Sequence, residues 1–177
     1  MALLQRRAFL AGAVTTVAFA RPAFADIGGT RTLAFDNLHT GERLAVDYWA
    51  EGAYLPEALT SINHLLRDFR TGDVHVIEPQ LLDLLALMRI RLETNSPFAV
   101  ISGYRSPASN ANLRAECEHS GVAAKSLHMQ GMAIDIRVAG RSLDAVHKTA
   151  LALRGGGVGF YPQSDFVHVD VGRVRTW

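Results

Sequence analysis

The sequence is poor in cysteine, in net charge and in long apolar runs. Cys117 is the only cysteine among 177 residues, so no disulfide can form within the chain. We expect this thiol to be a buried or half-buried small side chain. Lys and Arg number 18 against 17 Asp and Glu, which gives no indication of a strongly basic surface for nucleic acid. Repeats and low-complexity segments are also lacking.

The first 25 residues have the layout of an export signal. Arg6 and Arg7 form a basic head, residues 8–20 are apolar, and Ala23-Phe24-Ala25 is a small-x-small cleavage site. The apolar stretch is too short to span a bilayer comfortably. The paired arginines resemble a twin-arginine signal, and an ordinary secretory signal or an uncleaved anchor is the alternative. We therefore expect a cleaved leader over residues 1–25, no stable membrane anchor afterwards, and a periplasmic location.

The remaining segment, residues 26–177, has the size and balance of one compact domain. Removal of the leader takes away three arginines and no acids, which leaves 15 basic against 17 acidic residues and a net charge of −2. About 150 residues are enough to bury roughly two thirds of the unfolded surface in a single core. A second domain is not needed.

Local patterns predict an α+β fold with a small, mostly antiparallel sheet flanked by helices. Alternating stretches at Arg31–Phe35 and Leu44–Trp49, separated by turn-forming residues, predict a hairpin. Prolines and apolar periodicity predict helices, over 56–70, 79–92, from 107 onward and over 143–153. Short β-rich runs predict further strands, at 97–102, 132–138, 158–161 and 166–170.

Three residues of the C-terminal half have the chemistry of a catalytic zinc site. His128, Asp135 and His168 offer two imidazole nitrogens and a carboxylate oxygen. A catalytic zinc takes three such ligands and keeps its fourth position for water, whereas four protein ligands would indicate a structural site. The composition of this group therefore favours a metal-dependent hydrolase.

The spacing of these residues fits a site in a cleft on the sheet. A loop that carries His128 can turn at Gly131 and enter the apolar strand that contains Asp135. Alternate side chains of a strand share a face, so Asp135 points away from its isoleucine neighbours and away from the core. The strand that contains His168 has the same alternation, and pairing of the two strands would place His168 beside Asp135.

The motifs around these residues resemble those of the zinc D-alanyl-D-alanine metallopeptidases. The resemblance lies in Ser-x-His-x-x-Gly-x-Ala-x-Asp at residues 126–135, in Asp165-x-x-His168, and in Ser-Gly-Tyr-Arg-Ser at residues 102–106. That family includes D,D-carboxypeptidases, D,D-dipeptidases and murein endopeptidases. The branch of small exported murein endopeptidases, type K, resembles the chain from the region of Thr32 to the end.

The resemblance implies a role for each matching residue. One Zn²⁺ per chain would be held by His128, Asp135 and His168. Asp165 matches the acidic residue that serves as the catalytic base, although some relatives have Glu or a second His there. Arg105 matches an arginine that polarises the scissile carbonyl or holds a substrate carboxylate.

Plainer roles remain open for the residues around the ligands. Ser126 matches a serine near the substrate peptide, and it could equally satisfy a loop amide. Asp165 could cap the turn that precedes it, and Arg105 could form a surface ion pair. Asp170, two residues beyond His168, could orient that histidine or be a strand-end charge.

The resemblance implies that residues 26–177 form a zinc peptidase domain acting on peptidoglycan stem peptides. Cleavage of cross-links by an endopeptidase is the first expectation, and it rests on the resemblance alone. A D,D-carboxypeptidase that trims a terminal D-alanine is one alternative. A non-catalytic, zinc-stabilised wall-binding module is another, and the acid at Asp165 argues against it. Peptidoglycan is the expected partner, and no protein partner is indicated.

Overall fold

The computed structural model describes residues 29–116 and 123–177. The predicted leader, residues 1–25, and Cys117 lie outside these ranges. Within them, none of the helices combines the length and apolar character that a membrane span requires.

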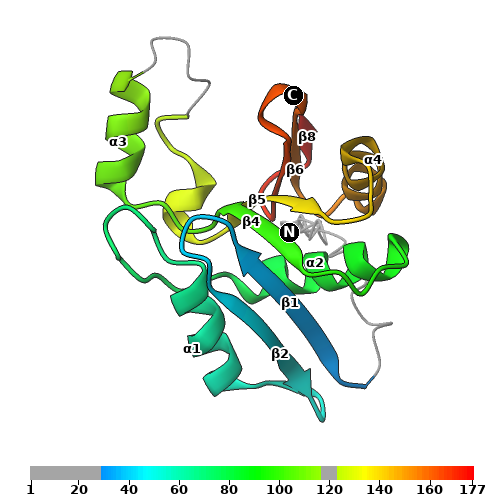
Figure 1. Cartoon of the computed structure of the whole chain (residues 1–177). Coiled ribbons are helices and arrows are strands. Elements are labelled where there is room, and N and C mark those ends of the chain that lie inside the picture. The colour runs from blue at the N-terminus through cyan, green and yellow to red at the C-terminus, as the bar shows by residue number, and fades with distance from the viewer. Residues whose placement is uncertain (1–28, 117–122) are drawn as a thin grey trace, which may run out of the picture.

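One sheet of eight strands forms the centre of the molecule (Figure 1), in the order β3-β2-β1-β4-β5-β7-β6-β8. Neighbouring strands are antiparallel except for the pairs β1–β4 and β6–β8. The predicted α+β class and the N-terminal hairpin are therefore confirmed. The strands are β1 (Arg31–Asn37), β2 (Arg43–Ala50), β3 (Ala53–Tyr54), β4 (Phe98–Ser102), β5 (Ala133–Val138), β6 (Gly157–Tyr161), β7 (Phe166–Asp170) and β8 (Arg175–Thr176).

In the part of the chain that the structure describes, four α-helices accompany the sheet, and three of them begin at a proline, whose missing N–H is not needed there. Helix α1 packs against β2, α2 against β1 and α4, and α4 against β5, β6 and β7. The helices are α1 (Pro56–Leu65), α2 (Pro79–Arg91), α3 (Pro107–Glu116) and α4 (Leu143–Leu153). The short 3₁₀ helices are η2 (Leu127–Gln130) and η3 (Pro162–Ser164).

The core lies between the sheet and helices α1, α2 and α4. Phe35, Phe98 and Val138 stand next to one another across β1, β4 and β5, and all three are buried. Ile136 and Val167 continue this apolar face across β5 and β7. Because successive side chains of a strand point to opposite faces, Asp135 and His168 lie on the face that is turned away from this core.

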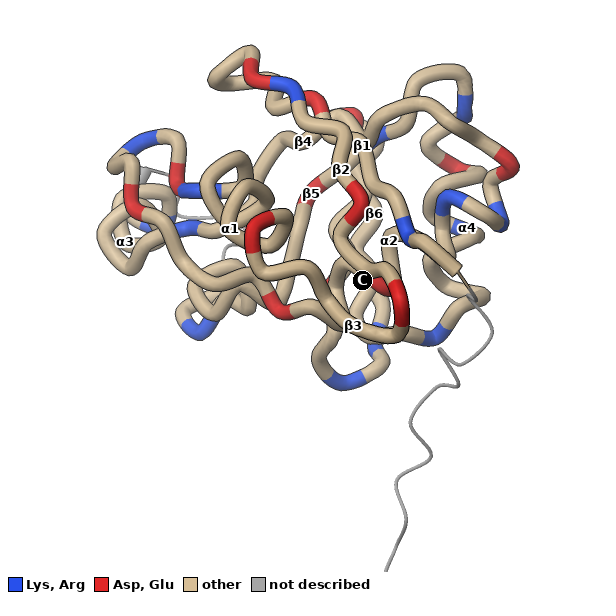
Figure 2. The backbone as a smooth tube through the Cα atoms, turned by 90° about the horizontal axis from the view of Figure 1, so that it is seen from below, with Lys and Arg blue, Asp and Glu red and all other residues tan. Residues whose placement is uncertain are grey.

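Charged residues of both signs are interspersed along the described chain (Figure 2). One carboxylate, Asp83 on α2, lies inside the core. It accepts hydrogen bonds from Arg31 (2.7 Å), Tyr48 (2.9 Å) and Tyr54 (2.7 Å). Burial, reinforced by this neighbouring carboxylate, raises the pKa of both tyrosines. Asp83 thereby ties β1, β2 and β3 to α2.

Helix α1 ends at Leu65, five residues before the predicted end near Arg70. The reason is Asp68, whose carboxylate accepts the backbone N–H of Arg70 (3.0 Å) and of Ser106 (2.8 Å). Side-chain bonds of this kind compete with helix formation. The chain therefore turns at Asp68, and the same carboxylate holds the segment that contains Arg105.

Candidate metal centre

His128 lies in a short turn whose two ends are fixed by Ser126 and Gly131. Its helix η2 is capped by the Ser126 hydroxyl, which accepts the His128 backbone N–H at 3.4 Å. The turn ends at Gly131 with φ of 66°, as the sequence predicted. A Cβ atom there would lie 2.1 Å from the Val76 carbonyl oxygen, so a larger residue does not fit.

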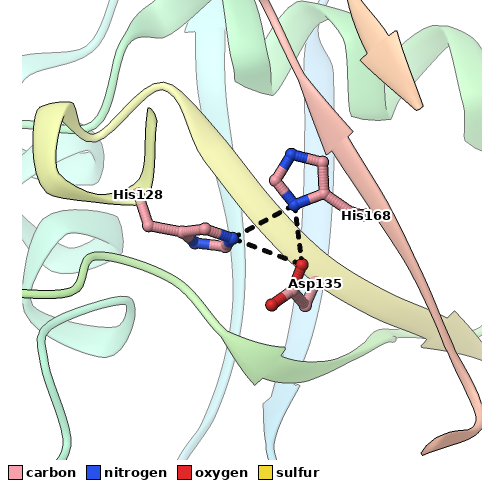
Figure 3. Close-up of side chains that lie close together, drawn as sticks. All are labelled: His128, Asp135 and His168. Atoms are coloured by element: carbon pink, nitrogen blue, oxygen red, sulfur yellow. Dashed lines mark hydrogen bonds and ion pairs between the residues drawn. The ribbon is translucent and has the colours of Figure 1, made fainter. Parts of the chain in front are cut away.

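The three predicted ligands converge (Figure 3). Asp135 and His168 lie directly opposite each other in the β5–β7 register, as predicted. His168 Nδ1 is 2.9 Å from Asp135 Oδ1 and 3.1 Å from His128 Nε2, and His128 Nε2 is 3.3 Å from Asp135 Oδ1. A tetrahedral ion with bonds of about 2.0–2.1 Å places its ligand atoms roughly 3.3 Å apart. The group therefore has the size of a zinc site.

The outer hydrogen bonds of the two histidines fix which nitrogen is free. His128 Nδ1 lies 2.7 Å from the Gly103 carbonyl oxygen, and His168 Nε2 lies 3.1 Å from Asp170 Oδ2. Both partners only accept hydrogen bonds, so these nitrogens carry the protons of the neutral rings. In these neutral tautomers, the lone pairs of His128 Nε2 and His168 Nδ1 face Asp135 Oδ1. A cation bound between the three atoms, whether a proton or a metal ion, would stabilise this arrangement.

The electrostatics of the buried group agree with this requirement for positive charge. The exposed fractions of His128, Asp135 and His168 are 3%, 5% and 8%. Burial alone would raise the pKa of Asp135, but the two histidines beside it lower the pKa overall, so the carboxylate is ionised. Burial would lower the pKa of His168, but Asp135 and Asp170 raise it overall. Protons and a metal ion therefore compete for this site.

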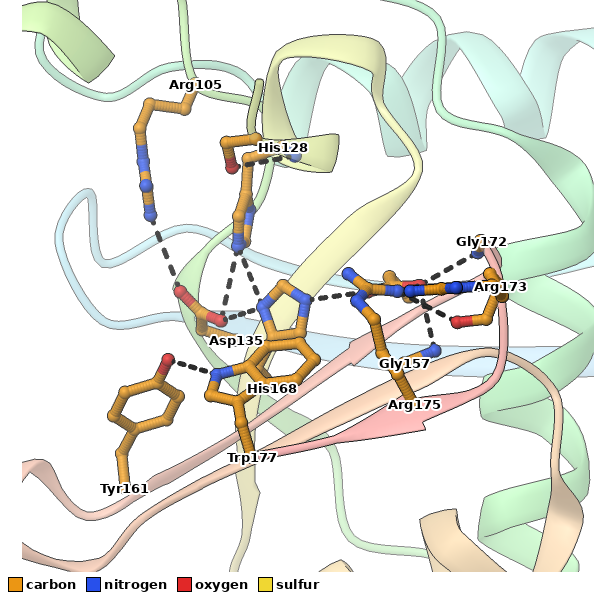
Figure 4. A network of polar contacts seen from close by, with 12 residues as sticks. Arg105, His128, Asp135, Gly157, Tyr161, His168, Gly172, Arg173, Arg175 and Trp177 are labelled. Atoms are coloured by element: carbon orange, nitrogen blue, oxygen red, sulfur yellow. Dashed lines mark hydrogen bonds and ion pairs between the residues drawn. The ribbon is translucent and has the colours of Figure 1, made fainter. Parts of the chain in front are cut away.

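Asp170 orients His168 through a contact with its Nε2 atom. The other partners of this carboxylate, Gly157, Gly172 and Arg175, lie together on the far side of the His168 ring from His128 (Figure 4). Asp170 is fully buried, and its oxygens accept the backbone N–H groups of Gly157 (2.9 Å) and Gly172 (2.8 Å). Arg175 Nη2 donates to Asp170 Oδ2 at 2.7 Å. Such carboxylate-histidine pairs fix the ring and raise its basicity as a ligand. Of the two roles left open by the sequence, the orienting one fits this geometry.

A cavity of about 390 Å³ opens onto the three ligands. Cationic side chains and aromatic rings line it together with the ligands, which makes it suited to an anionic or amphipathic ligand. Its lining residues are Arg105, Ala123, Lys125, Ser126, Leu127, His128, Asp135, Tyr161, Phe166, His168, Arg175 and Trp177.

The Arg105 side chain lies in this cavity, beside the ligands. It is 9% exposed, and its Nη2 is 3.6 Å from Asp135 Oδ2 and 3.3 Å from Ser102 Oγ. Its Nε has no hydrogen-bond partner among the described residues. Burial lowers the pKa of Arg105, although Asp135 opposes the effect. A buried guanidinium with a free donor is well suited to bind developing negative charge.

Asp165 lies outside the residues that line the cavity. It adopts a left-handed conformation at the end of η3, with φ of 53° and ψ of 48°. Its carboxylate, 62% exposed, forms an ion pair with Arg137. The structure thus brings Arg105 and Ser126 to the ligands but not Asp165, whose role as base stays a prediction.

Tyr161, Arg175 and Trp177 line the cavity and were not singled out from the sequence. Arg175 and Trp177 reach the site because β8 pairs with β6. A strand of two residues has no recognisable alternation, so no local pattern pointed to it.

Comparison with known proteins agrees with the motifs. The family model for peptidoglycan L,D-endopeptidase MepK matches residues 26–177. The chain is 42% identical over 158 residues to the peptidoglycan L,D-endopeptidase MepK of Escherichia coli K12, covering 88% of this chain and 86% of that protein. It is 43% identical over 148 residues to the probable peptidoglycan L,D-endopeptidase MepK of Haemophilus influenzae, covering 83% and 78%. The resemblance to the murein endopeptidase branch of the zinc D-alanyl-D-alanine metallopeptidases is confirmed, and the chain belongs to the MepK family of peptidases.

Proposed function

We propose that this protein is a zinc-dependent endopeptidase that hydrolyses cross-link amides between peptidoglycan stem peptides. The observation that carries the proposal is the convergence of His128 Nε2, His168 Nδ1 and Asp135 Oδ1 at separations of 2.9–3.3 Å in a cavity. Relatives named peptidoglycan L,D-endopeptidases supply the substrate class. Zinc is proposed because two imidazoles and a carboxylate are its usual catalytic ligands, with one ion per chain.

The chemistry supplied by a zinc ion held by His128, Asp135 and His168 is Lewis acidity, which activates water and polarises a carbonyl. Arg105 would stabilise the negative charge that develops on the carbonyl oxygen of the scissile amide. Removal of one donor of this kind costs roughly 3–4 kcal/mol of barrier in other hydrolases. Ser126 would act through the turn that it caps, because its hydroxyl is bonded to the backbone of His128.

Asp165 is proposed as the base that takes the proton of the attacking water and returns it to the leaving amine. It lies three residues before His168, and its carboxylate is exposed to solvent. To reach the cavity, Asp165 would have to leave Arg137, its partner in the ion pair. Arg137 would then control how often the base is available.

We further propose that the protein acts in the periplasm after cleavage of residues 1–25, with the twin-arginine route favoured by Arg6 and Arg7. The composition of the leader and the peptidoglycan substrate of the relatives support this location. Residues 26–177 would then be the mature catalytic domain.

Digestion of purified, cross-linked muropeptides tests the function. Mass spectrometry of products from the zinc-loaded protein, from a chelated sample and from Arg105→Ala should show dimers converted to monomers by the zinc-loaded wild type alone. The product masses identify the bond. Loss of terminal D-alanine with dimers intact would indicate a carboxypeptidase, and bound zinc without any conversion would indicate a wall-binding module.

A further inference from the structure

We propose that Trp177 is a substrate-binding residue whose indole forms an aromatic wall of the cleft beside His168. The inference rests on the proposed function and deepens it, because it assigns a ligand to a residue outside the motifs that carry the family resemblance. The ligand is the aliphatic side chain of the diamino acid that carries the cross-link amide.

The backbone fixes where the indole lies. Trp177 N donates to the Val158 carbonyl at 3.3 Å, and Phe160 N donates to the Trp177 carbonyl at 3.1 Å. Trp177 is therefore hydrogen-bonded to both neighbours of Gly159 on β6. Its side chain is held over that glycine.

Gly159 supplies the space for the ring. It lies directly opposite His168 in the β6–β7 register. A Cβ atom at this position would lie 2.8 Å from two atoms of the Trp177 indole, so a larger residue would displace the ring. The indole centroid consequently lies only 5.2 Å from that of the His168 ring.

One contact at the edge of the indole and one over its ring hold it in place, and about half of the residue stays exposed. Its Nε1–H donates to the Tyr161 hydroxyl at 2.6 Å, and the Arg175 guanidinium lies 4.8 Å from the ring centroid. Tyr161 in turn stacks on Phe166 at 4.6 Å. Trp177 is nevertheless 49% exposed. A large apolar ring that is fixed in place yet accessible has the properties of a binding hot spot.

The lining of the cavity combines apolar and cationic groups. Trp177, Tyr161 and Phe166 are its aromatic residues, and Arg105, Lys125 and Arg175 are its cationic ones. A cross-linked diamino acid combines an aliphatic chain with carboxylates. The chain would lie on the aromatic wall while a carboxylate faces the cations, which places the cross-link amide beside the ligands His128 and His168.

Substitution of Trp177 tests the role, with Val174 as a matched control. Val174 is also 49% exposed, lies three residues earlier and does not line the cavity. Trp177→Ala should lower kcat/KM on cross-linked dimers by roughly tenfold or more, mainly through KM. Trp177→Phe should retain part of the activity, and Val174→Ala should match the wild type. Zinc affinity, measured by chelator competition, should stay within about twofold in all three variants.

Fluorescence gives a readout that does not depend on turnover. Trp49 and Trp177 are the only tryptophans, so Trp49→Phe leaves Trp177 as the reporter. Titration of metal-free Trp49→Phe with cross-linked dimers should change its emission in a saturable way.

Three results would overturn the inference. The first is a KM of Trp177→Ala equal to that of the wild type. The second is a loss of activity in Trp177→Ala that is fully explained by a loss of bound zinc. The third is binding of dimers to Trp49→Phe, detected by calorimetry, without any change in the emission of Trp177. A wild-type protein that neither binds nor cleaves muropeptides would instead overturn the proposed function, and the inference with it.

Discussion

At the scale of single residues, each of the two histidines proposed as metal ligands is oriented by an acceptor outside the group of three candidate ligands. His128 is directed by the Gly103 carbonyl and His168 by Asp170. The Gly103 carbonyl belongs to the Ser-Gly-Tyr-Arg segment, so this segment contributes to the site through its backbone as well as through Arg105. A backbone carbonyl cannot be deleted by substitution, so Asp170 is the residue through which this dependence can be measured.

Asp170→Asn should weaken zinc binding by about 10- to 100-fold, because the amide no longer provides two charged acceptor oxygens for His168, Arg175 and the two glycine amides. Competition with a fluorescent chelator measures the affinity. Asp47→Asn, an exposed aspartate on β2, is the control and should be unchanged. Equal affinities in the two variants would contradict the orienting role of Asp170.

Asp165→Ala should retain zinc and lose roughly 10²- to 10⁴-fold in kcat, because the variant has no carboxylate to take the proton of water. Metal analysis and dimer cleavage measured on the same preparation separate the two effects. Arg137→Ala releases Asp165 from its ion pair and should not reduce turnover. Wild-type turnover in Asp165→Ala would remove this residue from the mechanism.

At the scale of elements, Asp68 connects the end of α1 to the segment that carries Arg105. Burial would raise the pKa of Asp68, but hydrogen bonds from Ser109, Ser106 and Arg70 lower it to about 2. A lowered pKa in the folded state stabilises the fold above the unfolded value of about 3.9. This contribution is lost as the pH falls through about 2.

Asp68→Asn should therefore reduce the free energy of unfolding by up to about 2 kcal/mol at pH 7, and the difference should shrink as the pH falls below about 4. Urea unfolding of both proteins between pH 2.5 and 7 measures it. A difference that does not change over this range would show that the charge of Asp68 is not the cause.

Asp83 is the corresponding link between α2 and the first three strands. Asp83→Ala removes the buried acceptor that Arg31, Tyr48 and Tyr54 share and should destabilise the fold by about 3–5 kcal/mol. Thermal unfolding measures the loss. Asp144→Ala removes only an exposed partner of Lys148 and should cost less than about 1 kcal/mol. Similar melting temperatures for the two variants would rule out a stabilising role for the Asp83 cluster.

At the scale of the whole molecule, the sequence predicted those helices and strands that local patterns determine. Proline starts and apolar periodicity identified α2 and α4, and strict alternation identified β5 and β7, whose pairing brings Asp135 to His168. The end of α1 was predicted wrongly, because Asp68 bonds to residues distant in sequence.

Long-range arrangement escaped prediction for a similar physical reason. The parallel pairing of β1 with β4 and of β6 with β8 depends on packing across the sheet, not on any local signal. Trp177 reaches the cleft only through the second of these pairings. The three candidate ligands were predicted from residue type and spacing, whereas the residues that surround them could be identified only from the assembled sheet.

Zinc titration of the metal-free protein, with dimer cleavage as the readout, tests the central claim most directly. Cleavage should rise in proportion to added zinc and level off at one equivalent per chain. His128→Ala should show no activity at that point, because it lacks one of the three ligands. Full cleavage by protein shown to be metal-free, or by His128→Ala at one equivalent, would contradict a single zinc site as the catalytic centre.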